Sequence, residues 1–296
     1  MPNTSFLQRF LQVQLTLNSG EFADGSNSKI IDSLAMTASI EKLGPPDFGK
    51  ASVEIYGMLL EDMEQLTTLN FQPLFVSRNY INIFAGDDVN GMSQVFAGTI
   101  TSASADFNSQ PEIKFKIEAQ IGFFGAVTAQ SPTAIKGSQS VSSFVEQQAQ
   151  KLGLTFVNEG VTASIRNCVF NGSPLAQARA AAAAVGAELI TDDDEMILLN
   201  KDQARTGDVP LLSKNSGLLG YPSITQNGIE LKAIFNPAFK FAGLIEIDSI
   251  VPKTSGQWRI VKLTHNLTSN MVSNGAWESS ITGFYPALSG ATGRFV

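Results

Sequence analysis

The chain has 296 residues, which is enough for two or three compact units, each with its own core. Charged residues make up 16% of the sequence, against roughly 25% in ordinary globular chains, so we expect part of the surface to contact other protein. The formal net charge is -7, and Lys and Arg are not clustered, which argues against a protein that binds DNA as its ligand.

The cysteine content and the amino terminus bear on where the chain is made. Cys168 is the one cysteine, so an internal disulfide and a thiolate metal cage are both excluded. The amino terminus lacks the basic, apolar and small-residue order of a secretory signal, and the longest nearly apolar run, residues 180–187, is far shorter than a membrane span. We therefore expect a chain that is made in the cytoplasm and has no membrane partner.

Strand alternation dominates the first part of the chain. Val13, Leu15 and Leu17 alternate with polar residues, as is typical of a strand with one wet face. Two prolines within residues 44–49 lack the amide hydrogens that a strand ladder needs, so this stretch is predicted to be a turn. About six strands with short connections predict a closed or nearly closed antiparallel barrel over residues 1–125. The expected elements after the first strand are strands at 34–40, 51–55, 80–84, 94–101 and 112–121 and a short helix within 57–69.

Helical spacing replaces strand alternation only in the middle of the chain. Val141, Phe144 and the apolar residues after them fall at intervals of three and four, and Gly153 ends the predicted helix. A second helix is expected over residues 175–185, since a Ser-Pro pair precedes it and a glycine follows it. Residues 126–206 are therefore predicted to form a small α+β module. Its β segments are expected at 154–157, 188–190 and 196–199.

Strand alternation returns over residues 207–296. The Ser-Ile pair at residues 39–40 occurs again at residues 223–224. A short internal repeat of this kind is expected if the two parts form barrels with the same fold. The predicted fold class is mainly β, with two antiparallel β-barrel domains and the small α+β module between them. Strands are expected near 224 and at 229–235, 244–250, 257–267 and 277–284.

His265 is the only histidine and a first candidate for chemistry. It falls at strand spacing with Val261, Leu263 and Leu267. A catalytic role would need a nucleophilic serine and an orienting carboxylate beside it, and the local sequence contains no such motif. We therefore expect His265 to pack in a core.

Acidic runs are the second kind of candidate. The run from Asp192 to Glu195 has oxygens that a hard cation prefers, but neighbouring strand residues point in opposite directions and the spacing of a calcium loop is missing. A solvated hairpin turn is the prediction. Asp87-Asp88 and the trio Glu61, Asp62 and Glu64 receive the same interpretation. Carboxylates from distant parts of the chain could still meet as a glycosidase pair, and spacing does not decide this.

The remaining candidates are also interpreted as structural. No strand is followed by a glycine-rich phosphate cradle, and Cys168 beside two apolar residues predicts a buried, inert thiol. The second helix, whose one charged residue is Arg179, is expected to pack internally, with a partner groove as the alternative. The sequence thus predicts no catalytic, cofactor-binding or metal-binding residue and no cofactor.

Several segments of the sequence resemble the baseplate hub proteins of contractile-tailed phages. In the last third these are Gly217-Leu218-Leu219-Gly220-Tyr221-Pro222-Ser223, Gly228-Ile229-Glu230-Leu231, Phe235-Asn236-Pro237, Gly256-Gln257-Trp258-Arg259-Ile260 and Trp277. In the first third they are Ser39-Ile40, Gly44-Pro45-Pro46 and Val53-Glu54-Ile55-Tyr56-Gly57-Met58. These segments are structural motifs and not catalytic motifs.

That resemblance implies a homotrimer in which each subunit contributes two tail-tube-like barrels to a ring of six. The ring would join the sixfold tail tube protein to the threefold central spike protein and contact other baseplate proteins. DNA would meet it only in transit, together with the tape-measure protein, through a channel whose wall we expect to be acidic, because the net charge of -7 would repel phosphates. The expected location is the tail baseplate of the virion, after synthesis in the host cytoplasm.

Three alternatives stay open at this point. Since every stretch is assigned to a barrel or to the middle module, we expect no cell-wall hydrolase, but a tail-associated cell-wall-degrading enzyme is the competing class. A spike-base protein of a type VI secretion system and a hub of a phage-derived bacteriocin are the other two.

Overall fold

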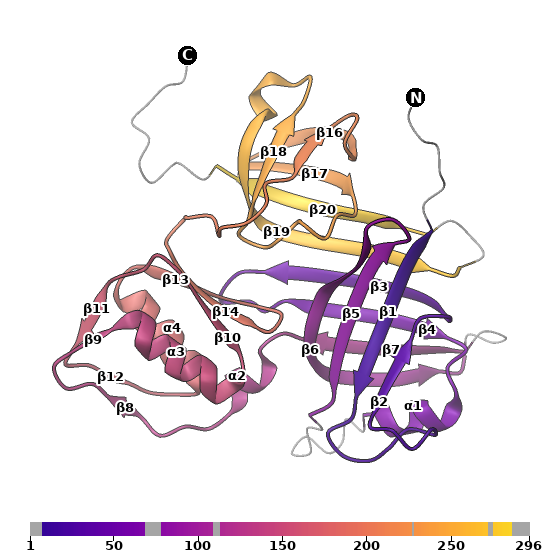
Figure 1. Cartoon of the computed structure of the whole chain (residues 1–296), viewed down its shortest axis with the longest axis horizontal. Helices are drawn as coiled ribbons and strands as arrows, with labels where there is room; N and C mark the ends of the chain where they lie inside the picture. Colours follow the sequence, from indigo (N-terminus) through magenta and orange to yellow (C-terminus); the bar gives the residue numbers. More distant parts are fainter. Residues whose placement is uncertain (1–7, 69–77, 109–112, 227, 272–274, 286–296) are drawn as a thin grey trace. The chain divides into compact units, whose positions relative to one another are not determined.

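The computed structural model describes residues 8–68, 78–108, 113–226, 228–271 and 275–285 (Figure 1). The chain forms two compact units, each drawn from three segments. Unit 1 contains Met1–Glu41, Lys50–Ile121 and Thr264–Ser279, and unit 2 contains Lys42–Gly49, Gly122–Leu263 and Ser280–Val296. In the described ranges, none of the helices has the length and apolar character needed to cross a membrane.

Unit 1 is built on antiparallel strands whose apolar side chains point inward. On the first strand Leu11, Val13 and Leu15 are fully buried, because a strand sends alternate residues to opposite faces. The strands pair in the order β3-β4-β7-β6-β5-β1-β2, and β19 lies next to β3. The bounds are β1 (Arg9–Thr16), β2 (Ser28–Ile31), β3 (Ala35–Leu43), β4 (Lys50–Tyr56), α1 (Leu60–Leu66), β5 (Tyr80–Asp87), β6 (Gly91–Asp106), β7 (Lys114–Gln120), β19 (Gly256–Ser269) and β20 (Trp277–Phe284).

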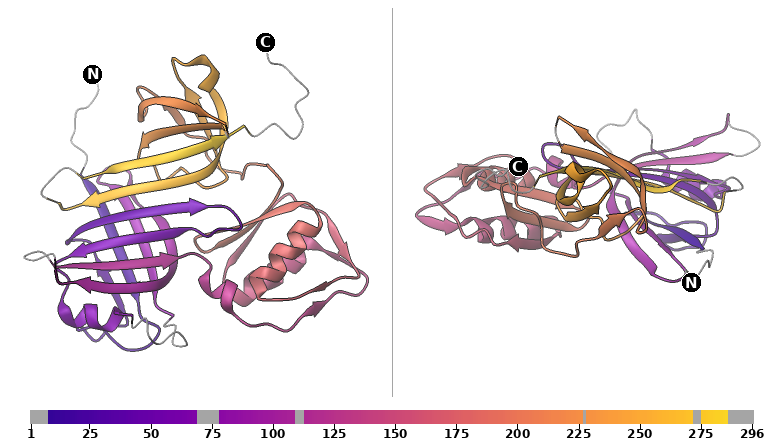
Figure 2. Two further views of the ribbon diagram at one scale, coloured as in Figure 1. Left: turned by 180° about the vertical axis from the view of Figure 1, so that it is seen from behind. Right: turned by 90° about the horizontal axis from the view of Figure 1, so that it is seen from above.

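The long strand β6 connects two layers of unit 1. Its first half pairs with β5 and its second half pairs with β7. Register shifts at Ile83/Phe84 and at Ile100/Ser102 interrupt the two ladders, and irregularities of this kind bend a strand and increase its twist. As a result β1 and β5 cross the direction of β3, β4 and β7, which both the front view and the view from behind show (Figures 1 and 2).

The middle of unit 2 is a three-stranded sheet packed against two helices. Strand β10 runs parallel to β14, and β14 forms an antiparallel hairpin with β13. The apolar stripe of α3, including Phe144 and Val145, is buried with α4 residues such as Ala178 and with the sheet residues Met196 and Leu198. The elements are α2 (Phe123–Val127), β8 (Thr133–Ala134), β9 (Ser138–Ser140), α3 (Val141–Leu152), β10 (Thr155–Glu159), β11 (Ser164–Arg166), β12 (Val169–Phe170), α4 (Pro174–Ala184), β13 (Ala187–Asp192) and β14 (Glu195–Asn200).

The end signals of both helices work as the sequence predicts. Gly153 adopts the left-handed conformation, with φ of 70°, and its amide bonds back to the last turn of α3. Ser173 accepts a hydrogen bond from the amide of Ala176, and Pro174 occupies the first turn of α4.

The remaining strands of unit 2 enclose a separate apolar cluster. Ile229, Ile245, Ile260 and Ile281 lie in it, each almost fully buried. The strand order is β16-β17-β20-β19-β18, and β15 pairs with β18 in the parallel direction. The elements are β15 (Leu211–Ser213), β16 (Leu218–Thr225), β17 (Gly228–Ile234), β18 (Leu244–Asp248) and the 3-10 turn η1 (Pro252–Thr254).

The mainly β fold class with a small α+β part is confirmed. The strand β2, at Ser28–Ile31, was not expected, and the short helix predicted within 57–69 is confirmed as α1. Among the described residues the pairs of unit 1 form an open path that ends at β2. The closure of each barrel and the domain boundaries at residues 125 and 206 therefore stay predictions.

Candidate functional site

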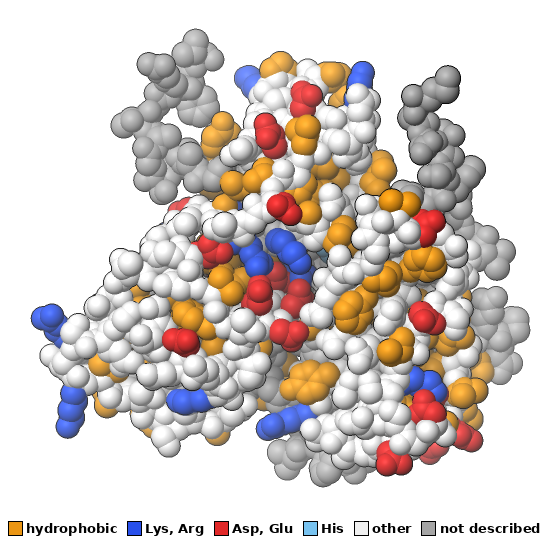
Figure 3. Space-filling model, in the orientation of Figure 1, with side chains coloured by type: hydrophobic (Ala, Val, Ile, Leu, Met, Phe, Trp, Pro, Cys, Tyr) orange, Lys and Arg blue, Asp and Glu red, His pale blue; other side chains and the backbone are white. Residues whose placement is uncertain are grey.

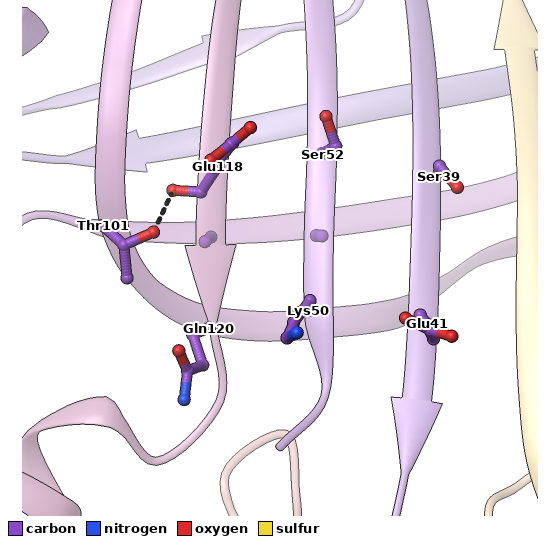
Figure 4. A pocket seen from close by; sticks show the side chains of 9 residues that line it. Ser39, Glu41, Lys50, Ser52, Thr101, Glu118 and Gln120 are labelled. Atoms are coloured by element: carbon purple, nitrogen blue, oxygen red, sulfur yellow. Dashed lines mark hydrogen bonds between the residues drawn. The ribbon is translucent and has the colours of Figure 1, made fainter. Parts of the chain in front are cut away.

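The outward face of β3, β4, β7 and the second half of β6 is polar. On β4, Val53 and Ile55 point into the core while Ser52 and Glu54 point outward. The face contains a shallow hollow of about 460 Å³, in which the Thr101 hydroxyl donates to the backbone oxygen of Glu118 at 3.1 Å (Figure 4). The polar side chains around it are Ser39, Glu41, Lys50, Ser52, Thr101, Glu118 and Gln120.

Several charges on this polar face are paired. Lys114 Nζ lies 3.1 Å from Glu54 Oε1, and Lys116 Nζ lies 2.7 Å from Glu118 Oε1. The hydrogen bond to Glu54, followed by the charge of Glu54, raises the pKa of Lys114. Each of these two lysines has a carboxylate partner, which weakens its attraction for a polyanion. The face is suited to contact with water, and its described residues include the exposed Lys50 besides the two paired lysines.

A second outward face of unit 1 carries no charged side chain among the residues that the structure describes. Strand pairing places one set of side chains together on the outside of β1, β2, β5 and the first half of β6, and in Figure 3 hydrophobic side chains gather over β1, β5 and β6. Phe10, Ile30 and Tyr80 are 36%, 56% and 46% exposed. The set, called here the uncharged face, is Phe10, Gln12, Gln14, Thr16, Ser28, Ile30, Tyr80, Asn82, Phe84, Met92 and Gln94.

The composition of the uncharged face is that of a protein contact. Interface cores are depleted of charge and enriched in aromatic residues and Met. The face combines those residues with Gln and Asn amides, while the polar face on the other layer keeps ion pairs such as Lys116–Glu118. Unit 1 thus presents two outer surfaces of different chemistry.

The run from Asp192 to Glu195 is a hairpin turn, but the prediction that it is solvated is wrong. Asp192 is 4% exposed and accepts a hydrogen bond from Lys42 Nζ at 2.8 Å and from Arg205 Nη1 at 2.9 Å. Asp193 accepts from Lys42 Nζ at 2.6 Å, and Glu195 accepts from Arg205 Nη2 at 2.7 Å. These five side chains, called here the Lys42 cluster, all belong to unit 2.

Burial and charge oppose each other in the Lys42 cluster. Burial lowers the pKa of Lys42, but the charges of Asp192 and Asp193 outweigh it, so the pKa is raised. Burial also raises the pKa of Asp192, yet Lys42 and Arg205 bring it below its usual value. The pKa of Asp193 is raised to about 6, because burial and the neighbouring Asp192 outweigh the attraction of Lys42.

His265 has the serine neighbour that the sequence did not reveal. Its Nδ1 lies 2.8 Å from the hydroxyl of Ser279 on the adjacent strand β20. Both side chains are buried, with His265 2% and Ser279 0% exposed. A nucleophile must be reached by its substrate, so this pair contributes to packing and hydrogen bonding in the core.

The other acidic candidates divide between a turn and a buried pair. Asp87 accepts from the amides of Val89 and Asn90 at 2.9 and 2.7 Å, and hydrogen bonding to Asn90 lowers its pKa. Asp62 is not solvated, contrary to the prediction: it is fully buried, ion-paired with Lys29. Its neighbours Glu61 and Glu64 are exposed.

Cys168 is half-buried. Within the described ranges, His, Cys, Asp and Glu form no group of three or more that could hold a metal ion.

A family model described as "Baseplate hub gp41" matches residues 10–273. The chain belongs to this baseplate hub family.

Solved structures share the fold at low sequence identity. The 43 kDa tail protein of prophage MuSo2 from Shewanella oneidensis has a TM-score of 0.62 at 8% identity, over 93% of this chain and 97% of that chain. A tail protein from Neisseria meningitidis has a TM-score of 0.62 at 8% identity, over 92% and 96%. The half-lidded PdpA–VgrG complex of Francisella has a TM-score of 0.57 at 10% identity, over 99% of this chain and 60% of that chain. No curated protein matches the sequence.

Family membership gives this chain a structural role in the baseplate of a phage tail, and hence a place in the virion. The polar face and the uncharged face of unit 1 are each built from side chains of several strands. The alternating Gln and Thr residues of β1 indicate from the sequence that one side of this strand is polar and uncharged. Which strands lie beside β1 and complete the uncharged face is known only from the strand order in the structure. The Lys42 cluster joins residues 150 positions apart, which no local pattern could reveal.

Proposed function

We propose that the chain is a structural hub that forms a trimeric ring in the baseplate, joins the tail tube to the central spike and surrounds the channel for DNA and the tape-measure protein. Membership of the baseplate hub family carries this proposal. The low content of charged residues, 16%, supports extensive contact with other protein. The proposed action is by shape and by contact at many points, without catalysis.

The uncharged face supports a contact between copies of the chain. Two molecules with net charge -7 repel each other, so they associate best through a surface that carries no charge. Residues Gln14 and Asn82 face each other near the middle of this surface. A second copy is therefore our proposed occupant.

A charge placed on the uncharged face tests this contact. The purified wild-type chain of 31.7 kDa is expected to show three times that mass by light scattering. Gln14→Lys is expected to give the monomer mass, because the new charge loses its water in the contact. Ser52→Lys, which is also half-buried and outward-facing but lies on the polar face, is the matched control and is expected to stay trimeric. A wild-type chain that stays monomeric and ignores both spike and tube proteins would contradict the ring.

The polar face supports a channel wall. It is hydroxyl-rich and its lysines include two that are paired with carboxylates. A wall of this kind lets a polyanion pass without strong attachment. An image of the assembled baseplate in which this face is covered by protein would contradict this part of the proposal.

Two other functions have defined tests. The likeness to a PdpA–VgrG complex favours, as second candidate, a spike-base protein of a type VI secretion system. Gene neighbourhood and co-assembly with the cognate spike separate this candidate from a phage hub or a bacteriocin hub. A tail enzyme would degrade cell-wall substrate on a zymogram, and we expect no cleared zone.

A further inference from the structure

Strand β16 is an exposed edge strand of unit 2. It is the last strand in the pairing order, and among the described residues it forms a ladder with β17 only. Along its other edge, every second residue therefore directs its backbone N–H and C=O groups away from the sheet. Five of its eight residues are exposed, so this strand faces solvent in the single chain.

The side chains of β16 give it little of the usual protection of an edge strand. Natural proteins protect such edges with charged residues, prolines and bulges. The strand contains Pro222 and a register shift between Leu219 and Ser223, but no charged residue. Instead Leu219, Tyr221 and Ile224 are 40%, 68% and 59% exposed, and hydrophobic side chains are visible over this part of unit 2 in Figure 3. An apolar, uncharged edge of this kind is suited to contact with another protein.

A closed ring of identical chains needs two different surfaces on each chain. In a twofold dimer one patch meets the same patch of the partner, whereas in a cyclic trimer one patch meets a different patch of the next copy. The proposed trimer therefore needs a counterpart for the uncharged face of unit 1. This counterpart must also be free of unpaired charge, because a charge that is buried without a partner loses its hydration. Strand β16 meets this requirement.

The uncharged face and β16 match in both of their chemical components. The face has the amides of Gln12, Gln14 and Asn82, and each amide offers N–H donors and a carbonyl acceptor. These groups are what the outward N–H and C=O groups of an edge strand require when they are covered. The aromatic side chains of the face, such as Phe10 and Tyr80, match the exposed apolar side chains of β16.

We propose that the uncharged face of one copy binds strand β16 of the next copy, so that the contact between copies is heterologous and closes into a ring. This inference rests on the proposed trimer and names the two surfaces that form it. Amides of the face hydrogen-bond to the open backbone of β16, while the apolar side chains of both surfaces pack together. Since the described residues of both surfaces include no charged side chain, the contact persists at high salt.

Two variants that each break one surface test this pairing by complementation. Gln14→Lys on the uncharged face and Ile224→Lys on β16 are each expected to give the monomer mass of 31.7 kDa by light scattering. An equimolar mixture is expected to give twice this mass, because β16 is intact in the first variant and the uncharged face is intact in the second. Val169→Lys, which replaces a β-branched residue of the same 59% exposure on β12, is the matched control and is expected to stay trimeric.

Crosslinking detects the same contact when it is too weak to survive dilution. Tyr221→benzoylphenylalanine is prepared in the full-length chain, since this side chain is exposed and its replacement leaves the core intact. After irradiation, linked peptides are identified by mass spectrometry. The expected links join position 221 to peptides of β1 or β5. A mixture of isotopically labelled and unlabelled chains shows that these links connect different copies.

The outcomes separate this inference from the proposed function. A wild-type chain that stays monomeric contradicts the trimer, and the pairing of surfaces is lost with it. If the wild type is trimeric and Ile224→Lys is trimeric too, β16 lies outside the contact and the pairing alone is overturned. The pairing is also overturned if the mixed variants stay monomeric without links to β1 or β5. Links from position 221 to β16 of another copy would replace it with a contact between two identical edges.

Discussion

His265 and Ser279 form a buried hydrogen bond between neighbouring strands of unit 1. Ser279→Ala removes this partner of the imidazole without creating a large cavity, so the buried imidazole loses this hydrogen bond. We expect the free energy of unfolding to fall by about 1–3 kcal/mol, measured by urea denaturation. Ser52→Ala on the polar face is the control and is expected to change it by less than about 0.5 kcal/mol. An equal loss in both variants would contradict the role of the buried bond.

Asp193 makes the stability of the chain depend on pH in an unusual direction. Its pKa is about 6 in the folded chain and 3.8 ordinarily, so between these values the folded state holds a proton that the unfolded state releases. Stability from this group is therefore lost as pH rises through about 6. Asp192 acts oppositely, because its pKa is lowered: its contribution is present above 3.8 and is lost as pH falls through its folded pKa.

Asp193→Asn tests this sign. The variant is expected to be more stable than the wild type at pH 8 and to lose that advantage at pH 5, as measured by urea denaturation at both pH values. Asparagine tolerates the left-handed backbone at this position, where φ is 51°. Asp194→Asn, on the exposed neighbour, is the matched control. A larger gain at pH 5 than at pH 8 would contradict the sign.

The elements show which features local sequence encodes. Helix α4 begins where a Ser-Pro pair predicts it, because the hydroxyl of Ser173 accepts from the amide of Ala176 at 3.2 Å. We expect Ser173→Ala to lower the free energy of unfolding by about 1 kcal/mol. Ser143→Ala, at an exposed position in the first turn of α3, is expected to be neutral or slightly stabilising, because Ala is the better helix former. Equal effects would mean that the cap contributes nothing.

Alternation and helical spacing located most strands and helices, because both depend on residues close together in the chain. They indicated which side chains face inward but not which inward polar groups find partners. For this reason the sequence predicts that Asp62 and Asp192 face water, whereas their partners Lys29 and Lys42 come from distant strands. The sequence also does not predict the parallel pairing of β15 with β18, since the three residues of β15 are too few to show a period.

For the whole molecule, the proposed channel wall predicts how charge affects the passage of DNA. The assembled wild-type ring is expected to retain little duplex DNA in a mobility shift at low salt, since Lys114 and Lys116 on the polar face are paired with carboxylates. Glu118→Lys breaks the pair with Lys116 and places two cations side by side. This variant is expected to bind DNA at least tenfold more tightly, and the binding should weaken steeply with salt. The control is Gln14→Lys, which adds a cation to the uncharged face and which we expect to be monomeric. Equal DNA binding by both variants would contradict a special position for the polar face.

The path of the chain through unit 1 has a consequence for synthesis. Strand β3 finds its neighbour β19 only in the segment Thr264–Ser279, which follows Ile121 by well over a hundred residues. At bacterial translation rates of about 5–20 residues per second, the first seven strands wait on the order of ten seconds for that neighbour. During this interval β3 presents an open backbone to other nascent chains. Ribosomes that pause after residue 121 should therefore yield insoluble chains, and chaperones that shield strand edges should be needed until the last hairpin emerges.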